Sequence, residues 1–148
     1  MKKSYCFYGW ENANCAPQDK LYHMIENPCV LYDMMSDIWC EYSCAPRLRK
    51  DWSKKNKTLG QCSITAFLVQ DIFGGQVFGV KLPDGGVHCF NVVDGVKFDL
   101  TSEQFGDEKL DYDDTPEQFR ADHFADKDKF ERYSYIKSQL LRKIIPLY

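Results

Sequence analysis

The sequence lacks long apolar runs and any excess of positive charge. Its longest mostly apolar run, Ile64 to Val69, is far shorter than the roughly 20 residues that span a bilayer, so we expect no transmembrane helix and no membrane partner. Nineteen basic residues stand against 22 acidic ones, so nucleic acid is not an expected partner. The basic start is not followed by an apolar segment, which predicts no signal peptide and a cytoplasmic protein.

The sequence is also poor in paired metal ligands. Its seven cysteines contain no C-x-x-C pair, and only three histidines accompany them. The odd number of cysteines and the missing export signal argue against a disulfide framework, so most of them should be free thiols. Because a structural zinc site usually needs two close pairs, we expect no metal and no cofactor. The simplest interpretation of any one cysteine is a small buried hydrophobe.

The chain is long enough for one folded domain. Leu, Ile, Val and Phe make up 36 of the 148 residues, above the fraction at which chains tend to stay disordered. No internal repeat or composition break divides the sequence. We therefore predict a single domain over residues 1–148, with a C-terminal helix over about 126–144.

Helical patterns dominate the first half of the chain. Pro17 to Glu26 has the pattern of a short helix that ends at Asn27-Pro28, since a residue before proline disfavours helix. Gln61 to Phe73 gives the clearest helix, and Gly74-Gly75 supplies its stop. Between them, a further helix that would also carry Cys40 and Cys44 is predicted by spacings of three to four residues: Leu31, Met34 or Met35, Ile38 and Tyr42.

A basic stretch precedes the clearest helix. Arg47 to Lys57 contains six lysines and arginines. The favoured interpretation is a solvated loop, and the alternative is the rim of a site for an acidic substrate.

The second half begins with a pattern of period two. Strands are predicted over Gln76 to Leu82, Val87 to Val93 and Val96 to Leu100, joined by turns at Pro83-Asp84-Gly85-Gly86 and Asp94-Gly95. This is an antiparallel meander of three strands. The fold class is therefore α+β, with N-terminal helices and a central cysteine-bearing helix packed on a small antiparallel sheet.

Helical signals return after the strands. Thr101 and Gln104 form a capping box that predicts a short helix. Asp107 to Glu117 is acidic and predicts a surface loop. A final amphipathic helix is predicted by a stripe of apolar residues: Phe130, Tyr133, Ile136, Leu140 and Ile144.

Cys62 is the candidate nucleophile. It lies in the first turn of the predicted central helix, where the positive helix end and unpaired amides favour thiolate over thiol. The same amides offer an oxyanion hole for a thioester-forming intermediate. Position alone is a weak signal, because many such cysteines serve only in packing.

Strand register supplies two partners for this thiol. If Asp94-Gly95 closes a two-residue hairpin, Val93 pairs with Val96. His88, Phe90, Asp99 and Thr101 then share one face of the sheet, and His88 and Asp99 form a diagonal pair within reach of a hydrogen bond. A histidine oriented by a carboxylate, on strands that follow a cysteine-bearing helix, is the arrangement that thiol acyl transfer needs.

Each partner also has a structural interpretation. His88 could be a strand histidine bonded to its surroundings, and Asp99 could cap the turn after it. The alternation of side chains along the strands places His88 and Asp99 on one face, and both follow the cysteine-bearing helix in the chain. Together these two observations favour a catalytic role over the separate structural roles. Cys89 points to the opposite face and is interpreted as core, not as a resolving thiol. His23 and His123 are interpreted as ordinary surface or interface residues.

The ordered combination of motifs resembles the bacterial YunG-like family of small proteins, over about Trp39 to Phe105. The chain order of cysteine, histidine and aspartate is similar to that of papain-like and transglutaminase-like cysteine enzymes. The motifs that carry the resemblance are Gly60-Gln61-Cys62-Ser63-Ile64-Thr65-Ala66, Val69-Gln70-Asp71 with Gly74-Gly75, His88-x-Phe90-Asn91 and Asp99-Leu100-Thr101-x-x-Gln104-Phe105.

The resemblance implies a catalytic-like core over about 39–105, with a papain-like or transglutaminase-like fold. It makes Cys62 the nucleophile, His88 the general base and Asp99 the group that orients it, and it needs no cofactor. The expected function is acyl transfer or amide hydrolysis on a small-molecule, peptide or protein amide or ester. The expected substrate-binding residues are Gln61, Trp52, Phe90 and Asn91.

Two other functions stay open at this point. One is a catalytically inactive module of the same fold that binds a peptide or protein beside Cys62. The other, which the sequence supports less strongly, is a redox sensor in which Cys62 forms a disulfide with another thiol.

Overall fold

The structure is a computed structural model that describes residues 3–145; the ends of the predicted domain, residues 1–2 and 146–148, lie outside the described residues. It is an α+β fold, as predicted, in which short 3₁₀ helices (η) join the longer elements. In chain order these are η1 Trp10–Asn12, η2 Lys20–Tyr22, α1 Pro28–Ser36, η3 Pro46–Asp51, α2 Cys62–Phe73, β1 Gln76–Lys81, β2 Val87–Val93, β3 Val96–Phe98, η4 Ser102–Phe105, β4 Glu117–Gln118, α3 Arg120–Phe124 and α4 Lys127–Ile144.

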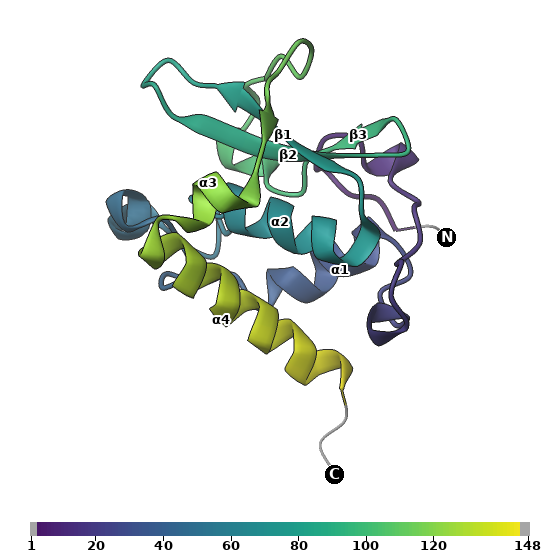
Figure 1. Ribbon diagram of the computed structural model, residues 1–148. Helices are drawn as coiled ribbons and strands as arrows, with labels where there is room; N and C mark the ends of the chain where they lie inside the picture. Colours follow the sequence, from purple (N-terminus) through teal and green to yellow (C-terminus); the bar gives the residue numbers. More distant parts are fainter. Residues whose placement is uncertain (1–2, 146–148) are drawn as a thin grey trace.

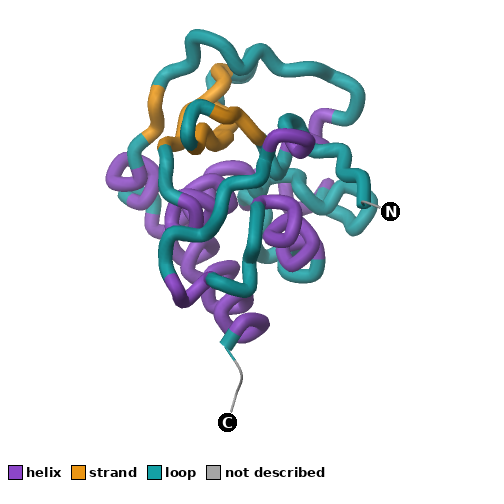
Figure 2. The backbone as a smooth tube through the Cα atoms, turned by 90° about the vertical axis from the view of Figure 1, so that its right-hand side faces the viewer, coloured by secondary structure: helices purple, strands orange, loops and turns teal. Residues whose placement is uncertain are grey.

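The elements stack in layers with α2 in the middle. The sheet covers one side of α2 and α4 crosses its other side, with α1 packed against α4 (Figure 1). Turned by a right angle, the strands gather at one end of the molecule and the helices at the other (Figure 2). Because apolar partners surround α2, nine of its twelve residues are buried. The main hydrophobic core therefore lies around this helix.

The sheet is antiparallel, and its register follows the hairpin prediction. Val93 pairs with Val96, and Asn91 pairs with Phe98. The two turn residues, Asp94 and Gly95, both have left-handed backbone conformations, with φ values of 51° and 80°, as a tight two-residue hairpin turn requires. The predicted turn residues thus set the register of the hairpin.

Strand β3 is shorter than predicted. It ends at Phe98 instead of Leu100, and the backbone N–H of the next residue, Asp99, donates to the carbonyl oxygen of Tyr8 at 2.9 Å. An N-terminal segment thus pairs with the residue that directly follows β3.

A fourth strand completes the sheet, which has the order β3-β2-β1-β4. Only the two residues of β4 pair with β1, so the segment is too short to show a period-two pattern. The predicted loop from Asp107 to Glu117 is correct up to Pro116. Its side chains are not all on the surface, however, since Tyr112 is buried.

The central and final helices match their predictions closely. Asn27 and Asp126 cap α1 and α4 with their side chains, whereas Gly74, with φ of 80°, ends α2. The apolar stripe of α4 packs against the core, with one exception: Phe130 is exposed.

The N-terminal helices were predicted less well. The helix expected over Pro17 to Glu26 is a single 3₁₀ turn, and Asn27-Pro28 begins a helix instead of ending one. Asn27 accepts a hydrogen bond from the backbone N–H of Val30 at 3.0 Å, and proline suits the first helical position. The helix ends at Ser36, so Cys40 and Cys44 lie in the turns that follow it.

All seven cysteines are free. Within residues 3–145, none of the helices combines the length and the apolar character that crossing a membrane requires.

The packing of α4 on the core can be tested with one leucine. Leu140 is fully buried, so Leu140→Ala should lower the free energy of unfolding by about 2 to 5 kcal/mol, because it removes apolar contacts and leaves a cavity. Urea denaturation followed by circular dichroism measures the change. The matched control is Leu21→Ala at an exposed position, which should change the free energy by less than about 0.5 kcal/mol. Equal effects of the two substitutions would contradict this packing.

Candidate active site

Cys62 is the first residue of α2, and its thiol is half-buried. Gln61 occupies the N-cap position, but its side chain makes no capping bond. The first amides of an α-helix have no partner within the helix, so uncapped N–H groups lie next to the sulfur. The Cys62 Sγ atom lies 3.9 Å from the carbonyl oxygen of Val87 on β2, which places the helix start against this strand.

His88 and Asp99 form a buried pair, each with only 1% of its side chain exposed. The Nε2 atom of His88 lies 2.6 Å from Oδ2 of Asp99, so the N–H donates to the carboxylate. Nδ1 is then the ring nitrogen that remains available to Cys62. The Phe105 ring stands edge-on to the imidazole, with 4.7 Å between ring centroids. The diagonal contact predicted from strand parity is present.

Further donors hold the Asp99 carboxylate. The backbone N–H of Thr101 lies 3.1 Å from Oδ1, and the Thr101 hydroxyl lies 3.3 Å from the same oxygen. The Tyr112 hydroxyl donates to Oδ2 at 2.7 Å. Asp99 therefore also fulfils the structural role of a turn partner. It follows that the predicted Thr101 cap is wrong in detail, because the hydroxyl binds Asp99 and does not cap η4.

The electrostatics of the site favour a charged thiol beside a charged imidazole. The hydrogen bond from the Cys89 thiol and the neighbouring His88 hold the pKa of Cys62 well below its ordinary value, although burial opposes them. Burial alone would lower the pKa of His88, but the charge of Asp99 and the hydrogen bond to it, together with Cys62, raise it to about 10. Both shifts favour the ion pair of a Cys62 thiolate and a His88 imidazolium.

Cys89 is a neighbour of Cys62 that the sequence did not reveal. It belongs to the core, as predicted, yet its thiol hydrogen-bonds to Cys62. That bond, burial and the charge of Cys62 raise the pKa of Cys89 well above its ordinary value. Its Sγ atom also lies 4.0 Å from Nε2 of His123. The raised pKa favours the protonated thiol of Cys89, the form that can donate to the Cys62 sulfur.

Cys62 and His88 line one cleft, with a volume of about 690 Å³. The walls come from η3, the β1–β2 turn, η4 and the start of α4. Among the basic stretch, Arg47 lines this cleft and lies 3.9 Å from Asp84 on the β1–β2 turn. Apolar side chains contribute much of the lining: Ala45, Pro46, Leu48, Leu59, Leu82, Val87 and Phe105.

The residues expected to bind substrate lie elsewhere. Gln61 is fully buried, and its Nε2 donates to the carbonyl oxygen of Cys40. Asn91 is buried against α2 and donates to the carbonyl oxygen of Ala66. Both side chains bond to backbone groups, which fixes loops and helices in place, and neither lines the cleft.

The two aromatic residues expected at the cleft are also absent from its walls. Phe90 shares the sheet face of His88 but packs in a small separate core with Val80 and Tyr112. Trp52 donates its indole N–H to the carbonyl oxygen of Lys57 and holds its own loop together.

No metal ligand cluster stands out at this site. Within residues 3–145, no three histidine, cysteine, aspartate or glutamate side chains are grouped so that they could hold a metal ion. The groups that the structure brings together at the site are a thiol, an imidazole and a carboxylate.

Comparison with known proteins identifies the family. The family described as YunG protein matches residues 27–144. The chain belongs to the YunG family. It is 34% identical over 109 residues to the Bacillus subtilis (strain 168) protein described as "Uncharacterized protein YunG", covering 74% of this chain and 87% of that protein. No solved structure matches the chain. The predicted YunG resemblance is confirmed, and the matched range contains Cys62, His88 and Asp99.

The reactivity of this YunG-family thiol can be measured directly. Iodoacetamide labelling of Cys62, read by mass spectrometry across pH, should reach half its maximal rate well below pH 8.5, the approximate pKa of a free cysteine. His88→Ala should move this midpoint upward, because the positive charge that stabilises the thiolate is lost.

The control is His23→Ala, which removes an exposed imidazole and should leave the midpoint unchanged. A midpoint near that of free cysteine in the wild type, with no response to His88→Ala, would show that the pair does not activate the thiol.

Proposed function

We propose that this YunG-family protein is a cysteine-dependent enzyme that catalyses acyl transfer or amide hydrolysis. The observation that carries the proposal is the buried 2.6 Å contact between His88 and Asp99 beside a cysteine at a helix start. A cysteine, a base and a group that orients the base are the parts that thiol catalysis needs.

The reaction divides into two steps. The Cys62 thiolate attacks the carbonyl carbon of an amide or ester, and the amides at the start of α2 stabilise the negative oxygen that develops. As the C–N or C–O bond breaks, the His88 imidazolium gives its proton to the leaving amine or alcohol, and a thioester remains on Cys62. Neutral His88 then takes a proton from water or an amine as that molecule attacks the thioester carbonyl. The C–S bond breaks, the acid or the new amide leaves, and the thiolate–imidazolium pair of Cys62 and His88 is restored.

The chain order supports a papain-like or transglutaminase-like core for this enzyme. The nucleophile begins a helix, the histidine lies on a following strand, and the aspartate follows the next strand. The cleft supports an acyl group with apolar surface, because leucine, valine and phenylalanine side chains lie beside Cys62. Free cysteines fit a reducing compartment, so we place the protein in the cytoplasm.

Trapping the acyl enzyme tests the proposal. Wild-type protein is incubated with nitrophenyl esters of graded chain length, peptide amides or glutamine amides. The reaction is quenched in acid, and the mass of the intact protein is measured by mass spectrometry. At least one donor should leave its acyl group on Cys62, because a thioester forms before water or an amine releases it. Cys62→Ala should lower kcat/KM by about 1,000-fold or more, since it removes the nucleophile.

The matched control is Cys6→Ala, which removes an exposed cysteine outside the cleft and should retain full activity. Absence of an adduct and of turnover with every donor would overturn the proposal, as would an adduct that persists in Cys62→Ala. Stable capture of a peptide by both wild type and Cys62→Ala, without turnover, would instead identify a binding module.

The pH dependence of kcat/KM tests the charged pair. Activity needs the Cys62 thiolate and the His88 imidazolium together, so it rises with pH through the lowered pKa of Cys62. It is lost as pH rises through the His88 pKa of about 10. Asp99→Asn removes the charge that raises this pKa, so the alkaline limb should move to lower pH. An alkaline limb that stays in place in Asp99→Asn would contradict the ion-pair assignment.

A further inference from the structure

The geometry points to Tyr112 as a positioning residue of the site, one that holds the Asp99 carboxylate in the orientation in which it binds His88. Its consequence for turnover rests on the proposed function, whereas its effect on the His88–Asp99 bond does not. Tyr112 comes from the acidic loop before β4, a segment whose composition predicts a surface loop.

The first observation in support is that Tyr112 and His88 bind the same oxygen of Asp99. The Tyr112 hydroxyl donates to Oδ2 of Asp99 at 2.7 Å, the same atom that accepts from Nε2 of His88 at 2.6 Å. Thr101 donors occupy Oδ1. A carboxylate can turn about its Cβ–Cγ bond, and donors on both oxygens oppose that rotation. Tyr112 therefore fixes the oxygen on which the orientation of the imidazole depends.

The second observation in support is that two aromatic rings pack against the ring of Tyr112. Tyr8 stacks on one face, with 3.9 Å between ring centroids and an interplanar angle of 19°. Phe90 stands edge-on to the ring at 4.9 Å. Tyr112 is 7% exposed, and an ordered ring between two aromatic neighbours loses little freedom when its hydroxyl binds. The hydroxyl is thus preorganised toward Asp99.

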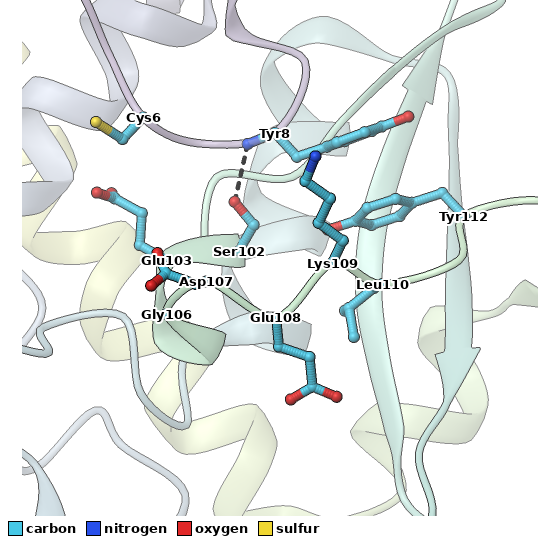
Figure 3. A pocket seen from close by; sticks show the side chains of 10 residues that line it. All are labelled: Cys6, Tyr8, Ser102, Glu103, Gly106, Asp107, Glu108, Lys109, Leu110 and Tyr112. Atoms are coloured by element: carbon cyan, nitrogen blue, oxygen red, sulfur yellow. Dashed lines mark hydrogen bonds between the residues drawn. The ribbon is translucent and has the colours of Figure 1, made fainter.

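The third support is the surroundings of the ring. Tyr8 and Tyr112 lie side by side on the wall of a separate cavity of about 630 Å³, together with Leu110 and Ser102 (Figure 3). The Ser102 hydroxyl accepts a hydrogen bond from the backbone N–H of Tyr8 at 2.8 Å. The N-terminal segment, η4 and the acidic loop thus meet around the ring that holds Asp99.

The test compares two identical substitutions. Tyr112→Phe removes the hydroxyl that binds Asp99, whereas Tyr133→Phe removes a hydroxyl that donates to the Asp71 carboxylate in another part of the molecule. Both variants lose one tyrosine-to-aspartate bond, so a general loss of stability affects them alike. A role in positioning Asp99 should affect only the first variant.

Two readouts are measured in both variants. The proton on Nε2 of His88 gives a far-downfield NMR signal when it is held in its bond to Asp99; in Tyr112→Phe this signal should broaden and exchange faster with water. With the acyl donor found for the wild type, kcat should fall about tenfold, the size of effect seen when outer partners of an oriented histidine are removed, while KM stays within about twofold. Tyr133→Phe should change neither.

Two outcomes overturn the inference: Tyr112→Phe with a wild-type signal and wild-type kcat, or Tyr133→Phe with the same losses as Tyr112→Phe. If no acyl donor is found for the wild type, the proposed function fails on its own test. The NMR signal still decides whether Tyr112 holds the His88–Asp99 bond.

Discussion

The buried contact between His88 and Asp99 is the constraint around which the rest of the site is arranged. Removing charged groups from water costs several kcal/mol each unless their hydrogen-bonding capacity is satisfied. The fold meets this cost with donors from three places: the imidazole on β2, Thr101 after β3 and Tyr112 on the acidic loop. One carboxylate therefore ties both the turn after β3 and the acidic loop to strand β2.

The two faces of strand β2 contribute different side chains to the site. Asn91 and Cys89 point toward α2, where the amide of Asn91 binds the helix backbone and Cys89 contacts Cys62. His88 points to the opposite face, toward Asp99. Cys62 can meet both neighbours because it lies at the end of α2 and not along its length. The helix start thus brings a thiol on one face of the sheet within reach of an imidazole on the other.

The parts of the site that could be predicted from the sequence depend on short-range geometry. Asp94-Gly95 forms a tight turn, and this turn pairs Val93 with Val96. Because side chains alternate between the two faces of a strand, this register places His88 beside Asp99. The residues that could not be predicted depend on contacts across the chain. Tyr112 lies in a segment with no periodic pattern, and its burial depends on Tyr8 and Phe90. Gln61 carries a polar side chain next to the nucleophile. Its side chain turns toward Cys40 and not toward the cleft because of a contact between residues 21 positions apart, which a local sequence pattern does not predict.

The N-terminal segment gives the site a dependence on folding order. Tyr8 accepts a hydrogen bond from the backbone of Asp99 and donates one to Ser102, 94 residues away in the chain. Contacts between distant residues form only after the loop between them has been closed, at a cost in entropy. During synthesis, Tyr8 must therefore wait until Ser102 has been made before this contact can form. The orienting carboxylate reaches its final position late, so a partly made chain carries the thiol before it carries the complete means to activate it.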